Sequence, residues 1–394
     1  MGKNNSFSNK NPCNGCGACY SVCPVSAIKF EINQNGFYEA FVDEDKCISC
    51  GKCVFVCPKY IGEEKQIDRN NFPAYSFVYN DEEILKGSSS GAVSWALIEI
   101  ALSKDYKVVG VEYDYISNTA KTFVYKDLKQ AQKSKGSKYV QSDTRIYKEI
   151  LKEQGKFIVF GTPCQLAGLA KAADMLKRRA DFLLVDCFCH GVPSYLLWHK
   201  FLKHIGIEQP KEVCFRSKKG GWHNFYMEIS DLNNKYCADV QTNPFYKLFF
   251  SDLLLNESCY SCKAKSATFS DIRIGDFWGS DYDLNEQGVS VVLPLSDSGK
   301  EWVALLKTKG KLKDISSLRN KIIKSQSAFF KTSCLAVFRE QLLLTLKQSN
   351  FAQVITQYHN SLSFKKKLVV KLKSLLPSYL IKYVRYIMHR KHGY

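Results

Sequence analysis

Eight of the 16 cysteines in this 394-residue chain fall into two copies of one short motif near the N-terminus. The motif is Cys-x2-Cys-x2-Cys-x3-Cys-Pro, and its copies begin at Cys13 and Cys47. Such tight spacing lets one short loop present several thiolates to an inorganic core, and the proline ends the loop. The repeat therefore predicts two 4Fe–4S clusters, as in bacterial ferredoxins, rather than a framework of disulfides.

The fourth cysteine of each copy is expected to bind the cluster of the other copy. The predicted ligand sets are Cys13, Cys16, Cys19 and Cys57 for the first cluster and Cys47, Cys50, Cys53 and Cys23 for the second. Small loop residues such as Gly15 and Gly51 let backbone N–H groups approach cluster sulfur. A pair of zinc ribbons is the alternative, but four cysteines this close together and followed by proline fit zinc poorly.

Composition places the chain among folded globular proteins, with 45% hydrophobic and 13% aromatic residues. The N-terminus has no apolar segment of the kind found in secretion signals, and no apolar run approaches the roughly 18–20 residues of a membrane span. Together with metal-type cysteine spacing, this predicts a location in the reducing cytoplasm.

The net charge of +18 is concentrated at the C-terminal end, where residues 341–394 carry ten Lys and Arg and no Asp or Glu. Apolar and basic residues alternate over 364–376 and 379–388, with Pro377 between them. This pattern predicts two amphipathic helices that touch an anionic membrane surface or an acidic partner, or else pack on the protein's own body. No recognition motif accompanies the basic residues, so we expect no nucleic-acid binding.

Strand and helix patterns alternate after a polar link at 62–71 and predict a mixed α/β (α+β) body behind the ferredoxin-type module. Strands are expected at 28–32, 37–42, 107–115, 122–125, 157–160, 182–186, 213–216, 226–230, 271–275 and 289–295, and helices at 92–102, 144–154, 166–176, 195–205 and 300–307. The chain becomes helical and basic from about residue 325.

Six further segments follow in order: Lys86–Ala92, Gly136–Ser142, Gly161–Gln165, Cys189–Ser194, Phe215–Lys218 and Asp271–Gly279. Together they closely resemble the beta-subunit family of coenzyme F420 hydrogenases and dehydrogenases, over roughly residues 5–325. The resemblance implies a ferredoxin domain at 1–64, the N-terminal and C-terminal parts of the beta-subunit domain at 72–150 and 151–325, and a basic helical tail outside it at 326–394. One departure is Ala92, where the family pattern has a second glycine after Gly91.

The family resemblance implies FAD and a third 4Fe–4S cluster in the larger, mixed-sheet domain. The ligands carried over by motif are Cys164, Cys189, Cys259 and Cys262. Cys187 lies two residues from Cys189 and stays open as an alternative ligand. By itself, Cys259-x2-Cys262 is half a metal site, and two buried thiols in a loop would explain it equally.

The residues expected to hold the flavin are Ser88, Ser89, Ser90, Gly91, Lys138, Thr162, Arg216 and Arg273. The serine run precedes a predicted helix, where hydroxyls and free N–H groups suit a phosphate, although an ordinary serine N-cap explains it too. Thr162 follows a buried strand and precedes a helix, the usual ligand position in α/β sheets. The arginines fit an anionic group, or else are solvated surface charges.

His190 is the candidate catalytic residue, as a proton donor near the flavin, with a satisfied core histidine as the alternative. Trp222, Phe277 and Trp278 either stack on the flavin ring or pack in the core. The sequence thus predicts an iron–sulfur flavoprotein oxidoreductase that acts on a small-molecule substrate or with a redox partner protein. The alternative is a non-catalytic electron-transfer subunit of a hydrogenase or dehydrogenase complex.

Overall fold

The computed structural model describes residues 12–62, 66–326 and 338–362. The two amphipathic helices expected at 364–376 and 379–388 lie outside these residues. Within the described ranges, no helix combines the length and apolar character needed to cross a membrane.

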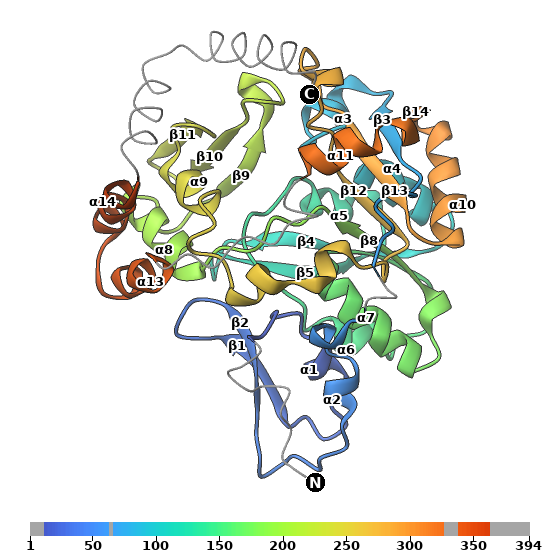
Figure 1. Ribbon diagram of the computed structural model, residues 1–394, viewed down its shortest axis with the longest axis horizontal. Helices are drawn as coiled ribbons and strands as arrows, with labels where there is room; N and C mark the ends of the chain where they lie inside the picture. The colour runs from blue at the N-terminus through green and yellow to red at the C-terminus, as the bar shows by residue number, and fades with distance from the viewer. Residues whose placement is uncertain (1–11, 63–65, 327–337, 363–394) are drawn as a thin grey trace.

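The N-terminal module is a small two-fold repeat at one end of the molecule, shown in blue in Figure 1. Strands β1 (Ile28–Ile32) and β2 (Tyr38–Val42) form the expected antiparallel hairpin. The short helices α1 (Ala18–Val22) and α2 (Lys52–Phe55) occupy the same place in each motif copy. Each follows a left-handed glycine, Gly17 with φ 72° and Gly51 with φ 74°, a conformation that glycine adopts without a steric cost.

The body is built on one mixed sheet of nine strands, in the order β14-β3-β13-β12-β8-β7-β4-β5-β6. The strands are β3 (Tyr75–Tyr79), β4 (Lys107–Asp114), β5 (Thr119–Tyr125), β6 (Ser142–Asp143), β7 (Phe157–Gly161), β8 (Phe182–Cys187), β12 (Ile272–Asp276), β13 (Ser290–Pro294) and β14 (Gly310–Asp314). Its centre, β4-β7-β8-β12, is parallel, and antiparallel strands flank it. Strands from both 72–150 and 151–325 therefore pair within one sheet.

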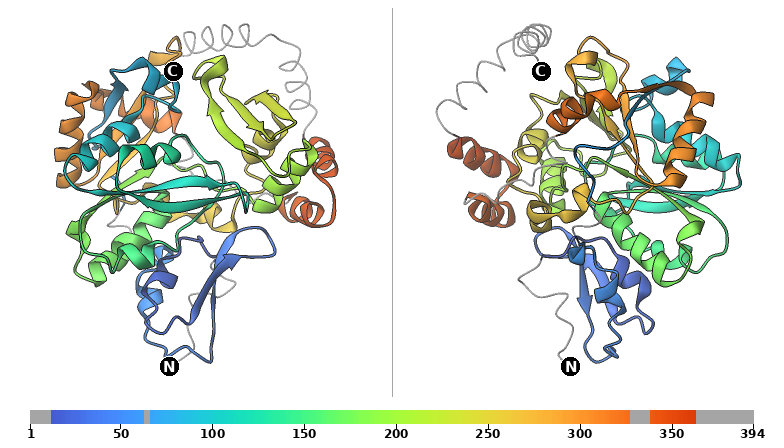
Figure 2. Two further views of the ribbon diagram at one scale, coloured as in Figure 1. Left: turned by 180° about the vertical axis from the view of Figure 1, so that it is seen from behind. Right: turned by 45° about the vertical axis from the view of Figure 1, so that its right-hand side comes forward.

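Helices cover both faces of this sheet, as the hydrophobic central strands require. One face packs on α4 (Val93–Leu102) and α10 (Asp297–Leu305), and the other on α6 (Tyr147–Ile150) and α7 (Pro163–Met175). The α6–α7 layer also contacts the N-terminal module, since Ala18 and Val56 belong to the same apolar cluster. Both views in Figure 2 show the module at one end of the molecule, next to this layer.

A second, three-stranded sheet, in the order β11-β10-β9, lies beside the large one (Figure 1). Its strands are β9 (Glu212–Ser217), β10 (Tyr226–Ser230) and β11 (Lys235–Asp239), and its helices are α8 (Tyr195–His204), α9 (Pro244–Phe249), α13 (Phe338–Gln348) and α14 (Phe351–Ser361). One apolar cluster joins these elements to β1 and β2 of the module. Three separate parts of the chain thus share one core.

The mixed α/β prediction is confirmed, and most predicted elements lie within a few residues of the observed ones. The helix expected at 144–154 is wrong in extent, because α6 spans only Tyr147–Ile150. Thr144, at its predicted start, instead uses its hydroxyl to bind the carbonyl of Cys16 at 2.9 Å. The sequence pattern also missed β3, an inner strand of the large sheet. It missed the edge strands β14 and β11 as well, whose alternation is weak and whose side chains are largely exposed.

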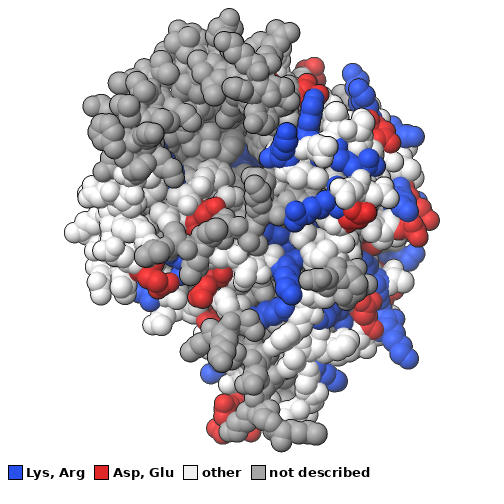
Figure 3. Space-filling model, in the orientation of Figure 1, with Lys and Arg blue, Asp and Glu red and all other residues white. Residues whose placement is uncertain are grey.

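Lys and Arg side chains on the face shown in Figure 3 are spread over the half that carries the large sheet and are interspersed with Asp and Glu.

Candidate metal centres

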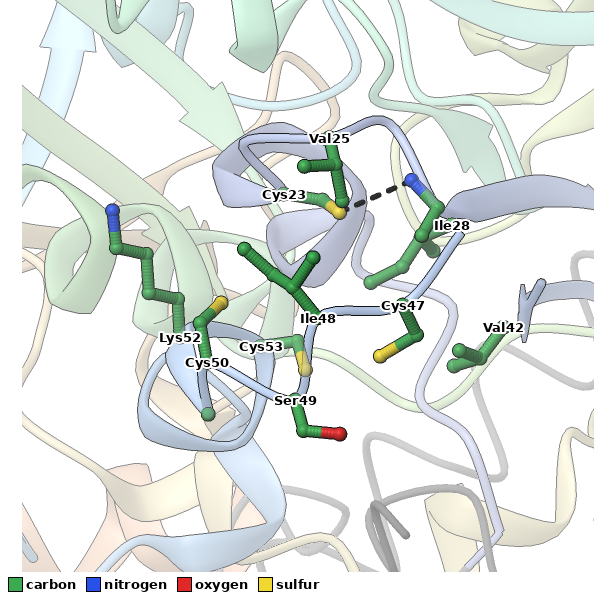
Figure 4. Close-up of a pocket in the computed structure, with 12 residues that line it drawn as sticks. Cys23, Val25, Ile28, Val42, Cys47, Ile48, Ser49, Cys50, Lys52 and Cys53 are labelled. Atoms are coloured by element: carbon green, nitrogen blue, oxygen red, sulfur yellow. Dashed lines mark hydrogen bonds between the residues drawn. The ribbon is translucent and has the colours of Figure 1, made fainter. Parts of the chain in front are cut away.

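The outer pocket, at the end of the module, is lined by Cys23, Cys47, Cys50 and Cys53 and has a volume of about 360 Å³. Figure 4 shows Cys23 reaching the hollow from one loop and the other three from the second motif copy. The N–H of Ala27 donates to Cys23 Sγ at 3.2 Å, the kind of bond that stabilises a thiolate. Cys50 is exposed and Ile48 beside it is 62% exposed, so this pocket is open to solvent.

The middle pocket, of about 390 Å³, is lined by Cys13, Cys16, Cys19 and Cys57. The N–H of Gly15 donates to Cys13 Sγ at 3.3 Å. The structure thus brings together the two crossed sets predicted from the sequence, each with three cysteines of one motif copy and the fourth of the other. Cys53 lines both pockets, so they are immediate neighbours.

The third pocket, of about 410 Å³, lies in the body and is lined by Cys164, Cys189, Cys259 and Cys262. Cys164 is the second residue of α7, and Cys189 follows β8. Cys259 lies in a 3₁₀ turn at Glu257–Ser261, which Cys262 directly follows. Cys187 does not line this pocket, so the geometry favours Cys189 as the fourth thiol.

The third pocket adjoins the middle one, and Asn14 lines both. The side chain of Gln141 joins them from the body, because its Nε2 donates to Asn14 O at 3.2 Å and its Oε1 accepts from Tyr38 N at 2.8 Å. Sequence reasoning gave neither residue a role. Their only signal was that Gln141 lies within the segment Gly136–Ser142.

Gly168 sets how closely α7 and the module approach. A Cβ at this position would lie 2.7 Å from Ala18 Cβ and 3.2 Å from Cys16 Sγ. Gly168 and Cys164 are four residues apart on α7 and so share one face of the helix. The missing side chain therefore lets a thiol of the middle pocket lie beside a thiol of the third.

Burial keeps the thiols of the third pocket protonated when nothing binds them. It raises the pKa of Cys189 to about 11 and of Cys259 to about 12, and raises the pKa values of Cys164 and Cys262 as well. Within the described ranges, no three His, Cys, Asp or Glu side chains close on a single metal ion. A cubane differs from a single ion because each thiolate binds a different iron atom, so its ligands surround a wider space. Four cysteines around one hollow fit the larger group.

Arg273 is completely buried and lies outside the lining of the third pocket. Its Nε and Nη2 donate to the two carboxylate oxygens of Asp186 at 2.6 and 2.5 Å. Its guanidinium also donates to the carbonyls of Lys265 and Ala267, at 2.7 and 3.0 Å. The arginine therefore orders the turn that follows Cys262.

The serine run expected to hold a phosphate makes internal hydrogen bonds. Ser88 Oγ donates to Ile84 O at 2.7 Å, Ser89 Oγ accepts from Ser137 N at 3.1 Å, and Ser90 Oγ donates to Val289 O at 3.0 Å. Ala92 takes a left-handed conformation with φ 62° at the start of α4. These contacts tie the loop to β13 and to the loop before β6.

Gly91 lies so close to the backbone of neighbouring segments that a side chain at this position would clash with them. An added Cβ would lie 2.2 Å from Phe77 O and 2.7 Å from Ser290 N. We expect Gly91→Ala to lower the free energy of unfolding by about 1–3 kcal/mol or more, as overpacking does. Gly87→Ala is the matched control, because its nearest neighbour would lie at 3.6 Å. Equal denaturation midpoints for the two variants would contradict this prediction and show that the loop at Gly91 can shift to accommodate a methyl group.

Thr162 and Lys138, also expected at a cofactor, have protein partners. The N–H of Thr162 donates to Gln165 Oε1 at 3.0 Å, and the Thr162 hydroxyl lies 3.4 Å from Cys164 Sγ. Thr162 lines the third pocket. Lys138 Nζ donates to the carbonyls of Ser134, Lys135 and Gly136. Burial lowers the pKa of Lys138 to about 7, while these three acceptors favour its charged form.

Arg216, on β9, is buried between two aromatic rings. Its Nη1 donates to Asp276 Oδ2 at 2.6 Å, and its guanidinium carbon lies 4.6 Å from the Phe225 ring centre and 5.3 Å from that of Trp278. Trp222 stacks on Trp278 at 5.1 Å. Arg216 is buried, and its guanidinium also interacts with the hydroxyl of Tyr139.

His190 lies next to Cys189 but does not line the third pocket. Its Nε2 is 2.6 Å from Asp252 Oδ1, and its ring packs edge-on against Phe249 and Phe250 at 5.0 and 5.6 Å. A carboxylate partner orients the imidazole, which suits either a proton donor or a structural histidine. Its catalytic role stays a prediction.

The pockets and the surrounding fold define an iron–sulfur, electron-transfer type of protein. Residues 12–61 match the family model of the 4Fe-4S dicluster domain, so the N-terminal module carries iron–sulfur clusters. Residues 154–317 match the family model for the C terminus of the coenzyme F420 hydrogenase/dehydrogenase beta subunit. These two matches confirm, over residues 12–61 and 154–317, the predicted resemblance to the beta-subunit family with an N-terminal dicluster domain.

Among solved structures, one similar chain belongs to the F420-reducing [NiFe] hydrogenase complex from Methanosarcina barkeri, in a xenon derivative. It is 18% identical, with a TM-score of 0.47, over 68% of this chain and 90% of that one. A search of curated proteins found no match.

Proposed function

We propose that this chain is an electron-relay subunit that carries single electrons between the exposed end of its N-terminal module and a site in its body. The observation that carries the proposal is the row of three cysteine pockets, in which each pocket shares a lining residue with the next, Cys53 and then Asn14. When bound in such pockets, 4Fe–4S clusters supply one-electron chemistry at low potential. The twelve cysteines act as ligands, and the fold fixes their spacing.

The outer pocket is the natural point of exchange with a partner protein. Its Cys50 is exposed, and Val25 and Ile48 beside it are 39% and 62% exposed. The third pocket is the inner end of the row and lies next to the switch from β8 to the following loop, where α/β sheets place ligands. The matched family model is named for the beta subunit of coenzyme F420 hydrogenases and dehydrogenases. We therefore propose that the partner of this chain is a catalytic subunit of a hydrogenase or dehydrogenase.

Metal content after anaerobic reconstitution tests the relay. Wild-type protein should hold about twelve irons, and Cys259→Ser with Cys262→Ser should hold about eight, since one cubane is lost. Cys187→Ser is the matched control, because Cys187 lies outside the third pocket, and it should keep the wild-type content. A wild-type protein that never exceeds about eight irons would refute the prediction of a third cluster.

A flavin enzyme is the second candidate, and Arg216 is the observation that favours it. Its buried guanidinium, beside the stacked Trp222 and Trp278, fits an anionic group attached to a flat ring. FAD held there would convert between single electrons and a two-electron step. The enzyme would then act on a small-molecule substrate bound in the larger domain. We place the protein in the cytoplasm.

Titration of the reconstituted protein with FAD, followed by flavin fluorescence, tests this second function. Saturable quenching by wild-type protein that weakens in Arg216→Lys supports a flavin at this site, because lysine loses the flat fork of donors. Arg319→Lys, on α11 (Arg319–Ser325), is the control. Wild-type protein that leaves FAD fluorescence unchanged would exclude the flavin and leave the relay.

A further inference from the structure

Lys265 is a buried cation in the wall of the third pocket. The residue is only 3% exposed, and it lines the pocket together with the four cysteines. Its Nζ donates to the carbonyl of His190 at 2.9 Å. An ammonium has three N–H donors, and within the described ranges no carboxylate forms an ion pair with this one.

A buried charge without a counter-ion is costly, so the missing partner calls for an explanation. The other buried cation nearby, Arg273, is neutralised by both oxygens of Asp186. The residues that line the third pocket together with Lys265 include no Asp or Glu. An anionic group in the pocket would supply the balance.

We propose that Lys265 is the counter-ion of the third cluster and raises its reduction potential; this rests on the proposed function. A cubane held by four thiolates is anionic, and reduction adds one more negative charge. A fixed ammonium in a dry wall therefore stabilises the reduced form more than the oxidised form. The outer pocket, open to solvent, has no such buried lysine among its lining residues, because its Lys52 is exposed.

The direction of this effect suits the row of pockets. A higher potential at the inner end favours electrons that arrive at the exposed outer end and collect in the body. Lys265 is thus a tuning residue that acts on the cluster through its charge, and its backbone carbonyl, held by Arg273 at 2.7 Å, keeps it in place.

Redox titration of the loaded full-length protein, followed by electron paramagnetic resonance, tests the proposal. The third cluster is identified as the component missing from Cys259→Ser with Cys262→Ser. In Lys265→Met this component should become at least about tenfold harder to reduce, a shift of about 59 mV to lower potential. Lys265→Arg should keep the wild-type value. Lys171→Met, whose Nζ lies 3.3 Å from Cys57 O, should instead move a component of the N-terminal module.

The outcomes separate this inference from the relay itself. A loaded Lys265→Met protein with an unshifted third component overturns the role of Lys265 and leaves the relay intact. Wild-type protein with only about eight irons overturns both. If Lys265→Met fails to load the third cluster, rescue by Lys265→Arg supports the counter-ion, whereas failure of both variants shows a purely structural residue.

Discussion

Replacing Cys13 and Cys57 together with serine should interrupt the relay in its middle. Both residues line the middle pocket and are only partly buried, so the fold should tolerate the change. Iron content is expected to fall from about twelve to about eight. Reduction of the third centre by a reduced ferredoxin should drop to a small fraction of the wild-type rate, because the electron must then cross from the outer to the third pocket in one step.

Rapid-freeze electron paramagnetic resonance would measure this rate for each centre. The outer cluster should still be reduced at the wild-type rate in the double variant, since its four cysteines are untouched. Cys214→Ser, at an exposed thiol on β9 outside the three pockets, is the control. Unchanged reduction of the third centre in the double variant would mean that electrons reach it by another route.

Arg273→Leu should be among the most destabilising single substitutions in the body. It leaves the Asp186 carboxylate buried without its cation and removes the donors to the carbonyls of Lys265 and Ala267. The expected loss is about 3–5 kcal/mol of unfolding free energy. Asp186→Leu combined with Arg273→Leu should recover part of it, because no charge is then left unpaired.

The loss of unfolding free energy in Arg273→Leu should be smaller at mildly acidic pH than at neutral pH. Burial already raises the pKa of Asp186, and removal of Arg273 takes away the charge that opposes the rise. The folded chain then holds a proton that the unfolded chain releases, so stability falls as the pH rises toward neutrality. Denaturation curves at mildly acidic and neutral pH would show it. Lys300→Met breaks an exposed pair with Asp297 and should leave the denaturation midpoint almost unchanged at either pH.

The N-terminal module was predictable because its chemistry is local. Ligand spacing within each motif copy is set by covalent chain length, and the crossed sharing of Cys23 and Cys57 follows from the proline after each. The hairpin between the copies was equally local, because alternation and a turn at Gly36 encode it. These features needed no knowledge of the rest of the fold.

The third pocket was only partly predictable. Its four thiols are up to 98 residues apart in the chain, from Cys164 to Cys262, so only the family motifs suggested that they meet. The choice between Cys187 and Cys189 depended on which residue leaves β8 toward the pocket. Strand direction and register decide that, and a residue count does not.

The sequence alone determined the two motif copies, the class of cofactor they bind and the alternation of strands and helices, because each is written in neighbours a few residues apart. Only the tertiary structure decided that the pockets form a row and that the hydroxyl groups of the serine run form hydrogen bonds within the protein. It also placed the single cation of Lys265 beside the thiols. These outcomes depend on packing between distant segments, such as Gly168 against Ala18, whose energies no local pattern encodes.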